Sequence, residues 1–128
     1  MDSWAVLAWL DGLEPAATRV DQAIRERPVM SWINLAEVYY RVHRDHGQEE
    51  AETVLSLLRG VLSLDEATPA RTLEAARIKA EHPIALADCF AVATAAAHRL
   101  TLLTGDPELV NAVELGCVVE DLRSRTAP

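Results

Sequence analysis

Hydrophobic residues along this chain recur mostly with the period of an α-helix, which predicts several amphipathic helices. A helix is also expected from Thr68-Pro69, because Thr caps helices and Pro fits the first helical position. The segment from about Ala85 to His98 is apolar almost all round, which predicts a central, buried helix. The helical stripes are Val20, Ala23 and Ile24; Leu35, Val38, Tyr39 and Val42; Ala51, Val54, Leu55, Leu58 and Leu62; and, after Pro69, Leu73, Ala76 and Ala80.

Short apolar segments of strand length lie between these helices. They run from Pro28 to Trp32, Val61 to Leu64, Leu100 to Thr104 and Cys117 to Glu120. Strands that alternate with helices predict an α/β fold with a mainly parallel sheet. In open sheets of this kind, ligands bind beyond the carboxyl ends of the strands.

The length of 128 residues predicts one domain, residues 1–128, and the hydrophobic half of the composition is enough for a core. No segment approaches the ~20 apolar residues that span a membrane, and no signal peptide is visible. Cys89 and Cys117 lie among apolar residues outside any C-x-x-C pair, which is typical of reduced thiols. We therefore expect a soluble, cytoplasmic protein.

The formal net charge of −8 does not by itself attract a nucleic acid. A protein with this charge that acts on a nucleic acid needs bound cations to offset part of it, or local basic clusters. Candidate clusters are Arg25 with Arg27, and Arg41 with His43, Arg44 and His46.

Four acidic residues stand inside or against apolar stretches: Asp2, Glu37, Asp88 and Asp106. Asp88 is the clearest, since residues 84–93 contain no other charged side chain, and a buried carboxylate is costly unless a positive group compensates it. Glu37 and Asp106 follow predicted strands, so they are expected near the carboxyl edge of the sheet. If the four acids converge, a divalent cation is the natural compensating group, and such a site acts on phosphates.

Each acid also has an ordinary structural interpretation. Asn34-Leu35-Ala36-Glu37 has capping-box spacing, and Asp106-Pro107 is typical of an N-cap followed by Pro. Asp2 would cap the next helix, and Asp88 would complement a helix N-terminus. The two interpretations are compatible, because capping uses only part of a carboxylate's lone pairs.

Some polar residues near the four acids could support them, and other polar residues are expected to face solvent. Ser3, Asn34 and Thr104 could orient the carboxylates or water, and Glu108 and Glu114 lie close to the Asp106 loop and could support the cluster. Asp65-Glu66 is expected to be solvated in a turn. No catalytic role is expected for His98, at the exposed end of the buried helix.

The acids and their flanks resemble the four motifs of PIN-domain proteins. The matching segments are Asp2 to Ala8, Ser31 to Val38, Leu86 to Ala93 and Leu103 to Glu108. Their order and spacing, and the total length, resemble the VapC toxins of bacterial toxin–antitoxin pairs over essentially the whole chain. The resemblance implies a three-layer α/β fold, in which helices flank a short, mainly parallel central sheet.

The resemblance also implies a function, an Mg²⁺- or Mn²⁺-dependent endoribonuclease. Asp2 and Asp88 would be the principal metal ligands, and Glu37 and Asp106 would complete the acidic cluster directly or through water. The implied substrates are structured RNAs such as tRNA or rRNA. The implied partners are a small VapB-type antitoxin and a second copy of the chain, and no membrane.

Two positions depart from the family pattern. Only Met1 precedes Asp2, where relatives usually carry several apolar residues that form the central strand. Either the recorded start is late, or the first strand is truncated. Ala85 stands where many relatives carry Ser, which removes a cap that typically contributes ~1 kcal/mol.

Other functions remain open at this level. The acidic pocket of a non-catalytic module would accept an Arg of the antitoxin through bidentate contacts. A DNA or repair nuclease is compatible with the same fold. A phosphoacceptor receiver domain would need a Lys after the last core strand, whereas Lys79 lies in a predicted helix.

Overall fold

The computed structural model describes residues 1–123, in which seven helices alternate with four three-residue strands. In chain order the elements are α1 Ser3–Leu10, α2 Ala16–Ile24, β1 Val29–Ser31, α3 Trp32–His46, α4 Gln48–Val61, β2 Ser63–Asp65, α5 Pro69–Glu81, α6 Leu86–His98, β3 Leu102–Thr104, α7 Pro107–Val110 and β4 Val119–Asp121. The predicted α/β fold is confirmed. The predicted domain of residues 1–128 stays a prediction, because residues 124–128 lie outside the described part.

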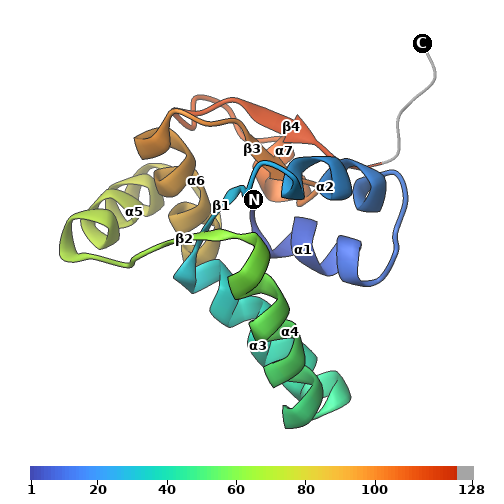
Figure 1. Ribbon diagram of the computed structural model, residues 1–128. Helices are drawn as coiled ribbons and strands as arrows, with labels where there is room; N and C mark the ends of the chain where they lie inside the picture. The colour runs from blue at the N-terminus through green and yellow to red at the C-terminus, as the bar shows by residue number, and fades with distance from the viewer. Residues whose placement is uncertain (124–128) are drawn as a thin grey trace.

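The strands form two parallel pairs, as the alternation of helices and strands predicted. β1 pairs with β2, and β3 pairs with β4. The first two residues lie between the pairs: the Met1 amino group donates to the Val29 carbonyl (3.0 Å), and the Asp2 N–H donates to the Leu103 carbonyl (3.4 Å). The start of the chain therefore occupies the middle of the sheet layer (Figure 1).

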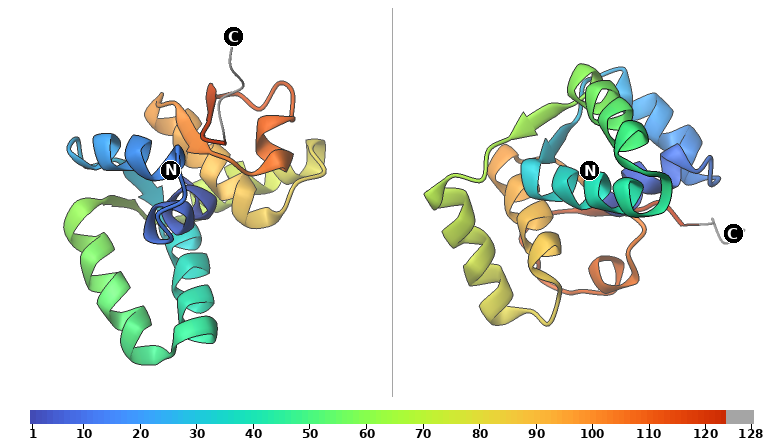
Figure 2. Two further views of the ribbon diagram at one scale, coloured as in Figure 1. Left: turned by 90° about the vertical axis from the view of Figure 1, so that its right-hand side faces the viewer. Right: turned by 90° about the horizontal axis from the view of Figure 1, so that it is seen from below.

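Helices cover both faces of this layer and contribute to two hydrophobic clusters. α1 to α4 pack with the β1–β2 pair around fully buried residues such as Met30 and Leu58. α5 and α6 pack with β3 around a second cluster that includes Val92 and Leu102. α3 and α4 form a hairpin that projects from the rest of the molecule (Figures 1 and 2). Gly47 joins the two helices with φ +93°, a conformation that glycine adopts at no steric cost.

The local signals placed most helices correctly. Thr68 caps α5 and accepts a hydrogen bond from the Arg71 N–H, with Pro69 at the first helical position, as predicted. α6 begins after Ala85, which makes no side-chain capping bond, and buries every residue from Asp88 to Ala95. Within residues 1–123, no helix has the length and apolar character needed to cross a membrane.

Three local predictions were wrong. The capping box at 34–37 does not form, because Ser31 caps α3 instead, accepting from the Ile33 N–H at 3.1 Å. On α5 the predicted stripe faces solvent, with Leu73 56% exposed, while Ala75 is the buried residue.

The third error is Asp65, which was expected to be solvated in a turn. Its side chain is only 10% exposed and forms a salt bridge with Arg71. A partly buried ion pair of this kind is invisible to local patterns, since the partners come from a strand and a helix that tertiary packing brings together.

Candidate functional site

Asp2 lies at the junction between the first backbone pairing and α1, and is only 1% exposed. It is the N-cap of α1: one oxygen accepts from the Ala5 N–H (3.0 Å), and the other accepts from the Thr104 hydroxyl (2.5 Å). Burial raises the pKa of Asp2 to about 6, although these two hydrogen bonds act to lower it. The carboxylate is thus fixed in position at an energetic cost, which a nearby cation would reduce.

Asp88 lies in the first turn of α6 and is 6% exposed. Its pKa is raised to about 7, first by burial and then by the negative charges of Asp106, Asp2, Glu37 and Glu108. Because all of these charges act on one carboxyl group, Asp88 lies at the electrostatic centre of the cluster.

Asp106 caps the short helix α7 and accepts from the Glu108 N–H at 2.9 Å. Its own N–H donates to the Thr104 hydroxyl oxygen at 3.0 Å. The Thr104 hydroxyl therefore accepts from the Asp106 backbone and donates to Asp2, which couples the end of β3 to the start of α1. Carboxylate oxygens of Asp88, Asp106 and Glu108 lie within 4.8 Å of one another, an arrangement able to hold a metal ion.

Glu37 approaches the cluster from the second turn of α3. It is half-buried, and its carboxylate accepts a hydrogen bond from the Ser3 hydroxyl. One turn earlier, the Asn34 amide donates to the Ala87 carbonyl at 3.0 Å and ties α3 to the first turn of α6. Within residues 1–123, the Asn34 Oδ1 atom is the buried side-chain oxygen without a partner.

The structure therefore brings together residues that are up to 104 positions apart in the sequence. The charges of Asp2, Glu37 and Asp106 all raise the pKa of Asp88. Each supporting residue named from the sequence makes a contact that orients one of the acids or the backbone beside it. Ser3 bonds to Glu37, Thr104 to Asp2 and Asp106, and Asn34 to the backbone beside Asp88. The capping interpretation also holds for Asp2 and Asp106.

Glu108 belongs more closely to the cluster than its sequence context indicated. An exposed Glu in the first turn of a helix is typical of a favourable helix-dipole interaction, and nothing local separates that role from a place in a metal site. Its position two residues after Asp106 was the available signal.

The chemistry of these donors fits a hard divalent cation. Each candidate ligand in the cluster is a carboxylate oxygen, which Mg²⁺ and Mn²⁺ prefer, whereas zinc sites use Cys and His. The raised pKa values of Asp2 and Asp88 show that the ionised cluster is destabilised by burial and by mutual repulsion. A cation bound among Asp88, Asp106 and Glu108 would relieve both.

Comparisons with known proteins agree with this geometry. The family model described as PIN domain matches residues 1–115. The VapBC complex from Salmonella typhimurium bound to DNA has a similar chain, with a TM-score of 0.74 and 19% identity over 94% of this chain and 95% of that one. VapBC2 from Rickettsia felis, bound to a DNA fragment from its promoter, gives a TM-score of 0.72 and 18% identity, with the same coverage. No curated protein matches the chain.

Proposed function

The chain belongs to the PIN domain family, and on that basis we propose that it is an Mg²⁺- or Mn²⁺-dependent endoribonuclease, the toxin of a VapBC-type toxin–antitoxin pair. The observation that carries the proposal is the convergence of Asp2, Glu37, Asp88 and Asp106 on one partly buried site. The likeness to chains of VapBC complexes supports the toxin assignment. The cytoplasm is the proposed place of action, with structured RNA such as tRNA or rRNA as the substrate.

The proposed roles draw on the resemblance to PIN-domain proteins and on the geometry. The resemblance makes Asp88 and Asp2 the principal ligands, with Asp106 and Glu37 completing the set directly or through water. The carboxylate oxygens of Asp88, Asp106 and Glu108 lie within 4.8 Å of one another, which adds Glu108 to that set. When bound, the cation supplies positive charge to the phosphate oxygens and acidifies an attacking water molecule. It also offsets part of the chain's net charge of −8, so that a polyanion can approach.

The chain's own residues orient the carboxylates and accept a proton. Ser3 and Thr104 each donate a hydroxyl hydrogen bond to a carboxylate, which fixes the direction in which its remaining lone pairs point. A carboxylate that does not bind the cation can accept the proton that the attacking water loses. No side-chain nucleophile is required, since water attacks the phosphorus directly.

The test is cleavage of total RNA by the purified protein with Mn²⁺ or with EDTA. We expect cleavage only with Mn²⁺, and a loss of at least about 100-fold in Asp88→Asn, the size of effect that removal of one electrostatic catalytic group produces. Glu66→Gln is the matched control, because Glu66 is an exposed acid outside the cluster. Equal loss in both variants would argue against the assigned site.

The second candidate function is an interaction module without catalysis. Within residues 1–123, no Lys or Arg forms a salt bridge with the acids of the cluster, and this favours the module, because an antitoxin Arg would neutralise the same carboxylates through bidentate contacts. Tight binding of a VapB-type antitoxin, together with no RNA cleavage in Mn²⁺, would support this module. The proposed partners, that antitoxin and a second copy of the chain, are tested by sizing the protein with and without the antitoxin.

A further inference from the structure

Trp4 lies beside the acidic cluster with part of its ring exposed. It is half-buried, whereas its neighbours Ser3 and Ala5 are buried. A Cβ atom at Gly105 would overlap three adjacent carbons of the Trp4 six-membered ring, Cζ2, Cη2 and Cζ3, to nearly the same extent. A point equally close to three adjacent ring atoms lies over the face of the ring and not beyond its edge. One face of the indole therefore rests on the Gly105 backbone.

Gly105 stands between two residues of the candidate site. Thr104 donates its hydroxyl hydrogen bond to Asp2, and Asp106 belongs to the acidic cluster. Successive Cα atoms are about 3.8 Å apart, so the ring covers backbone within one residue of a candidate metal ligand. Gly105 does not have a positive φ, so its conformation does not require glycine. The need for a residue without a Cβ atom comes from the Trp4 ring.

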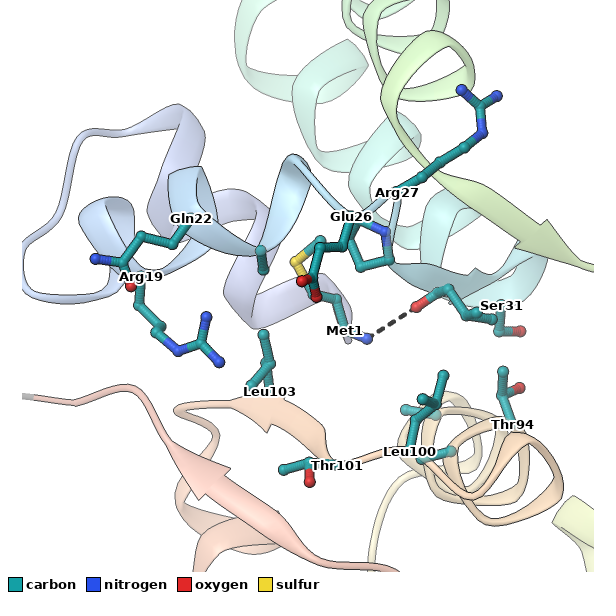
Figure 3. A pocket seen from close by; sticks show the side chains of 15 residues that line it. Met1, Arg19, Gln22, Glu26, Arg27, Ser31, Thr94, Leu100, Thr101 and Leu103 are labelled. Carbon is teal, nitrogen blue, oxygen red and sulfur yellow. Dashed lines mark hydrogen bonds between the residues drawn. The ribbon is translucent and has the colours of Figure 1, made fainter.

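The backbone ahead of Trp4 is held by the strands on both sides. The Met1 nitrogen donates to the Val29 carbonyl of β1, the bond that Figure 3 marks with a dashed line. The Asp2 N–H donates to the Leu103 carbonyl of β3, and Asp2 is then the N-cap of α1. The pairing that places Asp2 against Leu103 therefore also places Trp4 over the loop that follows β3.

The other two Trp side chains of the chain are already engaged. Trp9 donates its Nε1–H to Asp21 at 2.7 Å, and the Arg59 guanidinium lies 5.5 Å from the centre of the Trp32 ring. Within residues 1–123, the Trp4 indole N–H has no protein acceptor, and it is not a buried atom. Trp4 therefore presents both a partly exposed ring and a free donor beside the candidate site.

We propose that Trp4 is a stacking platform for an unpaired RNA base, next to the phosphate on which the acidic cluster acts. The base stacks on the ring face opposite Gly105, and the indole N–H donates to an oxygen of the same nucleotide. Aromatic side chains bind unpaired bases in this way whatever hydrogen-bonding edge the base presents. The inference rests on the proposed ribonuclease function and adds to it a feature of the substrate, a single-stranded cleavage site.

Stacking supplies affinity that the charges of the chain do not. The net charge of −8 opposes the approach of a polyanion, and the acids of the cluster add to this repulsion locally. A bound cation offsets part of the charge but contacts only phosphate oxygens. A base stacked on Trp4 holds the nucleotide through an uncharged contact. Duplex RNA keeps its bases inside the helix, so the platform selects loops and unpaired ends.

The probe is hexa-adenylate with a 5′ fluorophore, titrated with the full chain carrying Asp88→Asn, which leaves the probe intact under the proposed function. We expect saturable binding that becomes at least about tenfold weaker when Trp4→Leu is added, the size of effect that loss of one stacked base produces. Trp4→Phe should bind with intermediate affinity, because it keeps a smaller aromatic face. Trp9→Leu, on the same helix, is the matched control and should bind like the parent chain, because Asp21 already engages Trp9.

The matched ligand control is an abasic hexamer with the same phosphates, which should bind the parent chain about tenfold more weakly than hexa-adenylate does. A second measurement uses the chain with Trp9→Phe and Trp32→Phe, in which Trp4 is the sole source of tryptophan emission. Saturating hexa-adenylate should quench this emission. Unchanged emission would overturn the proposal even where Trp4→Leu fails to fold, and so would equal affinity for the abasic and adenylate hexamers or a lack of saturable binding.

These outcomes are separable from that of the proposed function, because none of the binding measurements needs cleavage. Quenching of Trp4 emission by hexa-adenylate, with no RNA cleavage in Mn²⁺ by the wild type, would support the platform and argue against the ribonuclease. Full cleavage activity in Trp4→Leu, with unchanged affinity for hexa-adenylate, would support the ribonuclease and overturn the platform.

Discussion

Replacement of Asp88 by Asn tests the central claim that repulsion and burial strain the acidic cluster. The Asp88 carboxyl group is 6% exposed, and its pKa is raised to about 7 by burial and by the surrounding acids. Asn has nearly the same shape and no charge. We therefore expect Asp88→Asn to be more stable than the wild type when metal is absent.

The sign and size of this stability difference follow from proton linkage. A folded-state pKa above the ordinary value of 3.8 means that the native state holds its proton more tightly than the unfolded chain. The associated stability is present below about pH 4 and is lost as the pH rises through about 7. At about 1.4 kcal/mol for each pH unit, the full cost at pH 8 is about 4 kcal/mol, and ions and water that reach the cluster reduce it.

The assay is urea unfolding in EDTA at pH 5 and at pH 8. The advantage of Asp88→Asn should be about 2–4 kcal/mol at pH 8 and less than half as large at pH 5, as the linkage predicts. Added Mn²⁺ should stabilise the wild type and leave Asp88→Asn nearly unchanged, because a ligand stabilises only the state that binds it.

Asp65→Asn is the matched control with the opposite sign. Burial alone would raise the pKa of Asp65, but hydrogen bonds from Arg71 and His98 hold it below the ordinary value. This variant should therefore lose stability at pH 8. If Asp88→Asn also proves less stable than the wild type at pH 8 in EDTA, Asp88 is a structural group at a helix end and the reasoning is refuted.

Three further substitutions test the framework of the site by urea unfolding at pH 8. Thr104→Val should cost about 1–3 kcal/mol, because it removes a hydrogen bond to the buried Asp2 carboxylate, and an unchanged midpoint would contradict that bond. Gly105→Ala should cost about 1–3 kcal/mol and alter tryptophan fluorescence, because its Cβ would overlap the Trp4 ring. An unaltered spectrum would count against this packing. Ala85→Ser should add about 1 kcal/mol by capping α6, and a loss of stability would show that the cap geometry is wrong.

The sequence alone determined the elements and the identity of the acids. Helical periodicity, the Thr68 cap and the continuous apolar run around Asp88 are local signals, since helix turns and caps depend on residues three or four positions apart. The same signals named Asp2 and Asp106 as caps, and both do cap helices. An uncompensated charge in an apolar run was the strongest single indication of a site.

Tertiary structure decided which of these residues meet and what else joins them. Glu108 entered the cluster because α7 turns it toward Asp88, and Asp65 is partly buried against Arg71 because α5 packs beside β2. Ser31, and not Asn34, caps α3, and the Asn34 amide instead donates a hydrogen bond to the Ala87 carbonyl of α6. Each outcome depends on packing between segments that are distant in the sequence.

A local pattern fixes which backbone groups a strand offers, but only the assembled layers decide whether those groups find a partner. For this protein the sequence therefore specified the chemistry, and the packing of its layers specified where that chemistry converges.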